Sequence, residues 1–225
     1  MKNENNNANN KLNAQKQHWE NTYCEEPRLF GEKPSYSAIR AAKLFQKEKA
    51  KKILELGGGH GRDTIFFATR KFHINVLDYC DNSIQTIKNT ANQLHISEYI
   101  NPSCHDVREK LSYPNEFFDA CYSHMLFCMA LTTIQLEFIF QEVRRVLKPK
   151  GTLVYTARNT KDVHFRHGIH RGEYMYENGG FIVHFFDKEK VETLAKGYEI
   201  LNIEEFEEGE LPRKLFVVTL RKEEN

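Results

Sequence analysis

The sequence lacks three features that would each point to a particular class of protein. Its five cysteines are scattered and never spaced as CxxC, which excludes a disulfide framework or a zinc ribbon as the organising principle. Lys and Arg number 32 and Asp and Glu 31, a formal net charge of +1, so no basic field favours nucleic acid. No apolar run approaches the roughly 18 residues of a membrane span, and the polar N-terminus argues against a signal peptide. We therefore expect a cytoplasmic protein that binds neither nucleic acid nor membrane.

Length and composition indicate one globular domain. At about 150 residues per domain, a chain of 225 residues holds one large domain, and 40% hydrophobic residues are enough for a core. Six of the first ten residues are Asn, so residues 1–13 are predicted to be a disordered tail and residues 14–225 a single domain. A monomer and a homodimer fit the sequence equally well.

Short apolar runs alternate with helical patterns along the chain. Five such runs end at Leu56, Leu77, Cys104, Tyr122 and Thr156, and amphipathic stretches lie between them. This alternation predicts an α/β fold with a mostly parallel sheet and helices on both faces. The β-rich segments 199–206 and 214–220 would add an antiparallel C-terminal strand, which gives seven strands in all.

The strongest local signal is the segment ILELGGGHGRD at residues 53–63. A buried strand there runs into four glycines, and a helix is predicted to begin near Arg62. Glycines at such a turn let a ligand approach the main chain closely, whereas the alternative is a plain strand–helix turn. The dinucleotide pattern GxGxxG fails because Arg62 stands in place of its third glycine, and no Walker lysine follows.

Carboxylates follow the next two predicted strands. Asp78 could accept hydrogen bonds from ribose hydroxyls, or it could cap the next helix. Asp106 could accept from an adenine amino group while Val107 packs on the ring, or it could be a turn aspartate. Ligands bind at the carboxyl ends of the strands in an open parallel sheet, so both carboxylates should lie at one edge with the glycine loop.

Five segments resemble, in order, the successive motifs of class I S-adenosylmethionine-dependent methyltransferases: LELGGGHGRD, LDYCD, HDV, FDACYSHMLF and LKPKGTLVYTAR. The resemblance covers about Ala50 to Ala157. It implies a Rossmann-like, doubly wound fold, S-adenosylmethionine as cofactor with S-adenosylhomocysteine as product, and a small-molecule methyl acceptor, as in the tellurite-resistance and thiopurine types. The alternative is a regulatory module that binds the cofactor without turnover.

The resemblance also implies which residues contact the cofactor. They are Glu55, Gly57, Gly59 and Gly61 around the methionine part, Asp78 at the ribose, Tyr79, Asp106 and Val107 at the adenine, and Ser123 near the methyl-bearing end. A general base is needed only for an acceptor that arrives protonated. His124 is then the candidate, although it could equally be a sheet-edge histidine satisfied by backbone groups.

The long connection at about residues 159–186 is predicted to be a substrate-capping insertion, because it is too aromatic for disorder and rich in glycine. We call this segment the cap. Its candidate substrate residues are His167, His170, Arg171 and Tyr174, and Arg171 with a histidine could hold an anion or a carboxylate. No acid or cysteine completes a ligand set with the cap histidines, so no metal is predicted. Trp19 and Tyr23 could fold over the cofactor or simply pack a helix.

Overall fold

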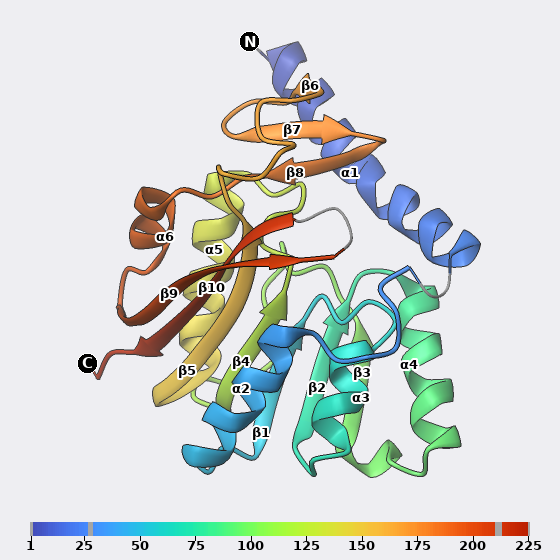
Figure 1. The fold of residues 1–225 in the computed structure, drawn as a ribbon, viewed down its shortest axis with the longest axis vertical. Coiled ribbons are helices and arrows are strands. Elements are labelled where there is room, and N and C mark those ends of the chain that lie inside the picture. Colours follow the sequence, from blue (N-terminus) through green and yellow to red (C-terminus); the bar gives the residue numbers. More distant parts are fainter. Residues whose placement is uncertain (1, 27–28, 210–212, 225) are drawn as a thin grey trace.

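A seven-stranded sheet forms the centre of the protein in this computed structural model, which describes residues 2–26, 29–209 and 213–224. The strand order is β3-β2-β1-β4-β5-β10-β9 (Figure 1). The strands are β1 (Lys52–Leu56), β2 (His73–Asp78), β3 (Ile100–Cys104), β4 (Phe118–His124), β5 (Leu147–Arg158), β9 (Tyr198–Glu208) and β10 (Arg213–Lys222).

The strand directions confirm the predicted sheet. Strands β1 to β5 pair in parallel, and β10 lies antiparallel between β5 and β9. The chain order of the five parallel strands requires helical crossovers on both faces. The fold is therefore a Rossmann-like α/β fold with an antiparallel C-terminal strand, as the sequence predicts. Residues 210–212, between β9 and β10, lie outside the described residues.

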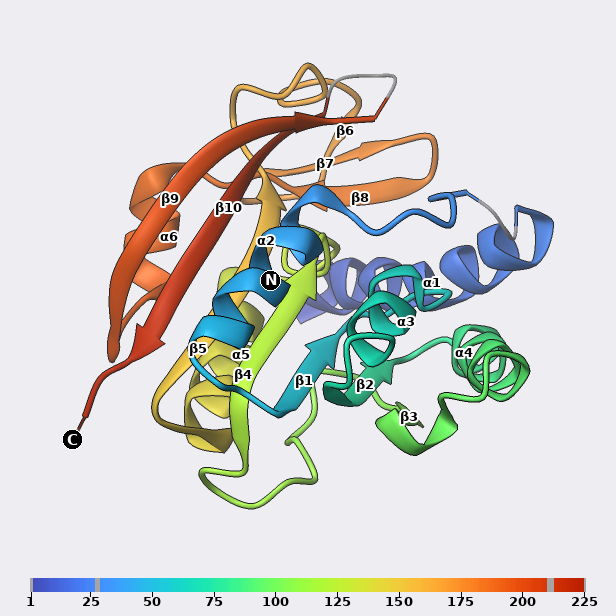
Figure 2. The same cartoon turned by 60° about the horizontal axis from the view of Figure 1, so that its bottom comes forward.

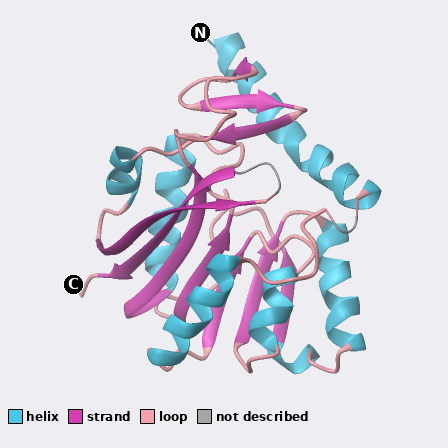
Figure 3. Cartoon of the chain, viewed as in Figure 1, coloured by secondary structure: helices cyan, strands magenta, loops and turns pink. Residues whose placement is uncertain are grey.

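Helices cover both faces of this sheet (Figures 2 and 3). One face carries α2 (Tyr36–Lys47), α3 (Arg62–Ala68) and α4 (Asp81–Gln93), and the other carries α5 (Thr133–Val146) and α6 (Lys188–Leu194). Alternation along β1 explains the two cores, because Ile53 packs with the first group of helices and Leu54 and Leu56 pack with the second. A short 3-10 helix, η1 (Ser97–Tyr99), precedes β3.

Side-chain caps fix where the helices of the second face begin. The Thr132 hydroxyl accepts from the backbone N–H of Gln135, whose side chain accepts in turn from the Thr132 N–H. This capping box starts α5. The Asp187 carboxylate accepts from the Lys190 N–H and starts α6.

The cap forms a small sheet of its own, with strands β6 (Ile169–His170), β7 (Met175–Asn178) and β8 (Phe181–His184) paired antiparallel. Helix α1 (Lys2–Glu25) lies beside β8 and continues toward α4 (Figure 1). Because α1 begins at Lys2, it includes the Asn-rich segment, and the division into tail and domain stays a prediction. No helix in the described part of the chain combines the length and apolar character needed to cross a membrane.

Candidate active site

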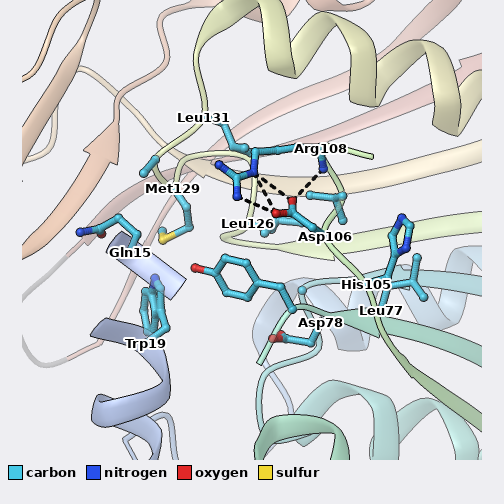
Figure 4. Close-up of a pocket in the computed structure, with 14 residues that line it drawn as sticks. Gln15, Trp19, Leu77, Asp78, His105, Asp106, Arg108, Leu126, Met129 and Leu131 are labelled. Atoms are coloured by element: carbon cyan, nitrogen blue, oxygen red, sulfur yellow. Dashed lines mark hydrogen bonds and ion pairs between the residues drawn. The ribbon is translucent and has the colours of Figure 1, made fainter. Parts of the chain in front are cut away.

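A pocket opens at the carboxyl ends of β1 and β2 (Figure 4). Gly57, Asp78 and Tyr79 line it from the ends of these strands, and the loops at residues 105–108 and 126–131 supply most of its other walls. Helix α1 contributes Gln15 and Trp19. The pocket holds about 520 Å³ of empty space, part of it open to solvent.

Glycine is required in the loop that follows β1. Gly57, Gly59 and Gly61 have φ angles of +72°, +51° and +84°, which L-residues rarely adopt. A Cβ at Gly57 would lie 2.9 Å from Leu126 Cβ, and one at Gly61 would lie 2.6 Å from Ile87 Cγ1. Neighbouring side chains therefore fill the space that a larger residue would need, and Gly57 of these three glycines lines the pocket.

Asp78 closes β2 and is 7% exposed. Its carboxylate accepts from the Gly59 N–H at 2.8 Å and from the Cys80 N–H at 2.9 Å. Burial raises the pKa of Asp78, and these two backbone hydrogen bonds oppose that shift. Asp78 thus fixes the glycine loop against the start of α4, and its oxygens keep lone pairs for a ligand hydroxyl.

Glu55 on β1 is 2% exposed, and its Oε2 has no hydrogen-bond partner among the described residues. Burial raises its pKa to about 8, against a lowering by the Thr64 hydroxyl, and the nearby Asp63 and Asp78 add to the rise. An unpaired buried carboxyl costs stability, and a positively charged group close by would remove that cost. Glu55 is not among the residues that line the pocket, and its predicted contact with the cofactor stays a prediction.

Asp106 and Arg108 form a bidentate pair at the pocket wall (Figure 4). Arg108 Nε lies 3.0 Å from both carboxylate oxygens of Asp106, and Nη2 lies 2.6 Å from Oδ2. Burial by itself would raise the pKa of Asp106, but the hydrogen bonds from Arg108 outweigh it and lower the pKa. Asp106 is thus a fixed carboxylate beside Val107, and the predicted role of the two residues at an adenine stays a prediction.

Ser123 and His124 lie at the end of β4, outside the set of residues that line the pocket. The Ser123 hydroxyl is buried and donates to the Leu56 carbonyl at 3.1 Å. His124 Nδ1 lies 3.0 Å from Thr156 Oγ1, and Nε2 lies 3.1 Å from Glu208 Oε2. Both ring nitrogens of His124 therefore contact the protein, and the predicted roles of the two residues stay predictions.

None of the four candidate substrate residues of the cap is among the residues that line the described pocket. Each has a partner within the cap: the Phe165 carbonyl for His167 Nδ1 at 3.1 Å, the Glu173 carbonyl for His170 Nε2 at 2.9 Å, the Glu177 carboxylate for Arg171 Nε at 2.6 Å, and the Phe165 ring for the Tyr174 ring at 5.4 Å between centroids. Their binding of an acceptor stays a prediction.

The cap histidines are not arranged as a metal site. Within residues 2–26, 29–209 and 213–224, no group of three or more His, Cys, Asp or Glu side chains could hold a metal ion. His164 Nδ1 lies 3.0 Å from Arg158 Nη2, a contact that joins the cap to β5.

Sequence reasoning missed part of the pocket. Trp19 was one of two residues considered as a cover for the cofactor, and it does line the pocket. Leu126 belongs to the segment FDACYSHMLF, but Gln15 and residues 129–131 are not predicted, because an isolated glutamine and a short apolar loop carry no motif. The presence of Trp19 four residues later on the same helix face was the one available signal for Gln15.

The fold is Rossmann-like, and its pocket carries carboxylates after the second and third strands, at the edge where such folds bind their ligands. Residues 53–151 match the family model described as "Methyltransferase domain". This segment is therefore similar to a methyltransferase domain, and the cofactor that such a domain would bind is part of the function proposed below.

Three solved structures illustrate the shared fold. A SAM-dependent methyltransferase from Methanosarcina mazei is 18% identical, covers 85% of this chain and 100% of its own, and has a TM-score of 0.71. The Burkholderia thailandensis 1,6-didemethyltoxoflavin-N1-methyltransferase, solved with that substrate and S-adenosylhomocysteine, is 14% identical over 94% and 88%, with a TM-score of 0.74. TehB from Haemophilus influenzae is 17% identical over 91% and 67%, with a TM-score of 0.67. No curated protein sequence matches the chain.

Proposed function

We propose that this protein transfers a methyl group from S-adenosylmethionine to a small-molecule acceptor. The observation that carries the proposal is the convergence of Gly57, Asp78, Tyr79, Asp106 and Val107 on one pocket of a methyltransferase domain. The Burkholderia thailandensis protein, which has the same fold, is named for methylation of a small heterocycle and supports the proposed acceptor class.

The residues present fit the cofactor. Glu55, Gly59 and Gly61 would hold its methionine part and Asp78 its ribose. Tyr79 and Asp106 would hold the adenine with Val107, and Ser123 would lie near the methyl-bearing end.

When bound, the cofactor supplies a methyl group already activated by a sulfonium centre. The protein must then orient the acceptor and exclude water, and orientation alone is worth about 7–11 kcal/mol in favourable cases. Trp19, Leu126, Met129 and Leu131 give the pocket an apolar lining suited to this task.

His124 is our proposed general base for a protonated acceptor. Its contacts with Thr156 and Glu208 mean that one of them must break, or relay the proton, during turnover. If His124 is the base, His124→Asn should flatten the rising arm of the pH–rate profile and leave cofactor affinity unchanged. An unaltered profile would remove His124 from the chemistry.

The decisive experiment is calorimetric titration of ligand-stripped protein with S-adenosylhomocysteine, with NADH as the control. Binding of the first ligand alone supports the proposal, and a screen of thiol, amine and hydroxyl acceptors then measures turnover. Tight binding without turnover on any acceptor would favour the regulatory module. Preference for NADH, or binding of neither ligand, would contradict the proposal.

A further inference from the structure

One glutamine joins helix α1 to the cap at the edge of the pocket. The Gln15 amide nitrogen donates to the Gly180 carbonyl at 2.9 Å, and its amide oxygen accepts from the Ile182 N–H at 3.1 Å. Gln15 is 8% exposed and also lines the pocket. A single side chain therefore satisfies two backbone groups of β8 and its preceding turn, and it forms part of the ligand site.

Aromatic contacts reinforce this joint. The rings of His18 and Trp19 pack on Phe181 of β8, with centroid separations of 4.2 Å and 4.7 Å. Trp19 lies one helical turn from Gln15 and lines the same pocket (Figure 4). The part of α1 that contacts the cap is thus the part that covers the pocket.

The other end of α1 rests on the cofactor loop and on α4. A Cβ at Gly59 would lie 2.9 Å from the Tyr23 hydroxyl, so Tyr23 packs directly on the glycine loop. Glu20 accepts from the Asp81 N–H at 2.7 Å. Helix α1 therefore connects the cap to the glycine loop, and a shift at β8 would be transmitted to Trp19.

This inference rests on the function proposed above. We propose that Gln15 is a positioning residue that binds the β8 backbone and thereby fixes Trp19 against the pocket. The strands of the cap, β6 to β8, contribute no residue to the described pocket lining. Through Gln15 they still set how tightly the cofactor is held, so a cap that changes with the acceptor changes cofactor affinity as well.

Two neighbouring glycines offer a test from the cap side. Gly180 has a φ of +84°, and a Cβ there would lie 2.8 Å from His18 Cε1. Gly179 has a φ of +56°, and a Cβ there would meet nothing within 4 Å. Both Gly→Ala changes strain the backbone, but Gly180→Ala also pushes against α1. Neither glycine lines the pocket, so a difference in ligand affinity between the two variants reports on the contact between α1 and β8.

The chain contains one tryptophan, so fluorescence excited at wavelengths that tyrosine does not absorb reports on Trp19 alone. Gln15→Leu removes both hydrogen bonds and should weaken S-adenosylhomocysteine binding about tenfold or more. It should also shift Trp19 emission to the red without ligand. Gln15→Glu keeps an acceptor for the Ile182 N–H, so its affinity for S-adenosylhomocysteine should lie between that of Gln15→Leu and that of the wild type. The control, Gln17→Leu, alters an exposed side chain of the same helix that bonds to Asn21, and it should bind as the wild type does.

Gly180→Ala should weaken binding and shift the emission in the same directions, whereas Gly179→Ala should bind within about twofold of the wild type. Equal affinity and emission in the two glycine variants would overturn the inference. So would weaker binding by Gln15→Leu with unchanged ligand-free emission, since Gln15 would then act by direct contact. If Gln15→Leu does not fold, the comparison of ligand affinity and Trp19 emission between Gly180→Ala and Gly179→Ala tests the inference alone. Failure of the wild type to bind the ligand would instead contradict the proposed function, because the emission shift is measured without ligand.

Discussion

The pocket edge of the sheet and the cap use similar residues in different ways. At the pocket edge, Asp78 and Asp106 come from separate strand ends and meet around one cavity. In the cap, His170 and Arg171 contact a carbonyl and a carboxylate of the cap itself. Both regions are polar and aromatic, yet only the first presents its polar groups to the described pocket.

The difference follows from how each region satisfies its backbone. Strands obtain their hydrogen bonds from neighbouring strands, so side chains at their ends remain available for ligands. A long connection must satisfy its own N–H and C=O groups, and its side chains are used for that purpose. We therefore expect changes in the cap, away from its contact with Gln15 of α1, to alter mainly stability, and changes at the pocket edge to alter mainly ligand affinity.

The largest effect on stability should come from the root of the cap. Arg158 and Asp162 form a buried ion pair, and the Asp162 carboxylate also accepts from the Lys214 N–H at 2.9 Å. Asp162→Ala leaves the Arg158 charge buried and should lower the free energy of unfolding by about 3–5 kcal/mol. Denaturant unfolding measures this, and S-adenosylhomocysteine affinity should change less than about fivefold.

The matched control is the neighbouring exposed ion pair between Lys161 and Glu205. Lys161→Ala should cost no more than about 1 kcal/mol. An equal loss in both variants, or a loss of affinity larger than the loss of stability for Asp162→Ala, would erase the contrast between the cap and the pocket edge.

Two glycines with positive φ angles compare the regions directly. Gly57→Ala places a Cβ 2.9 Å from Leu126 Cβ inside the pocket, whereas Gly172→Ala in the cap, at φ +96°, meets nothing within 4 Å. Gly57→Ala should weaken S-adenosylhomocysteine binding about 100-fold, or nearly 3 kcal/mol. Gly172→Ala should cost about 1 kcal/mol of stability and leave affinity unchanged. Titration calorimetry and denaturant unfolding of both variants test this, and similar affinities would contradict it.

The sequence predicted the sheet and its cofactor edge well for the same reason. Strand ends are marked by apolar runs that stop at a glycine or an acid, as at Leu56–Gly57 and Leu77–Asp78, and parallel pairing then places those ends together. These are local signals combined by one geometric rule, so no knowledge of tertiary packing is needed.

The remaining part of the pocket depends on packing between distant segments. Gln15 reaches the backbone of Gly180 and Ile182, more than 160 residues away, and nothing local marks such a contact. His124 has a residue type and position suited to catalysis, but its partners Thr156 and Glu208 come from strands far along the chain. Sequence patterns predicted the strand or helix that carries such a side chain, and they could not predict its hydrogen-bond partners.

Asp78 provides a moderate test at the pocket edge. Asp78→Ala removes the acceptor for the Gly59 N–H as well as the proposed ribose contact, and it should weaken S-adenosylhomocysteine binding by about 1.5–3 kcal/mol, or tenfold to 150-fold. Asp78→Asn keeps one acceptor oxygen and should lose less. Titration calorimetry gives both values, and an unchanged dissociation constant in folded Asp78→Ala would remove Asp78 from the site.

The last comparison is between two buried carboxyls with opposite pKa shifts. Burial raises the pKa of Glu55 to about 8, so the folded protein holds a proton that the unfolded chain releases. Its contribution to stability therefore falls as the pH rises between the ordinary value of 4.5 and about 8. Burial alone would also raise the pKa of Asp162, but hydrogen bonds from Arg158 lower it. The contribution of Asp162 to stability is present when the pH is above the ordinary pKa of 3.8, and it is lost as the pH falls through the lowered pKa.

Glu55→Gln should therefore be more stable than the wild type at mildly alkaline pH, with the difference growing by about 1 kcal/mol per pH unit across the neutral range. The free energy of unfolding of Asp162→Asn should be lower than that of the wild type by a constant amount over that range, and this difference should shrink only at acidic pH. Denaturant unfolding at a series of pH values measures both slopes. A parallel pair of curves would mean that Glu55 is ionised in the folded protein, so that its carboxyl is paired and not free for a cationic ligand. Diverging curves would mean that the folded protein keeps a proton on the unpaired Glu55 carboxyl at neutral pH, whereas the Asp162 carboxylate stays ionised in its pair with Arg158.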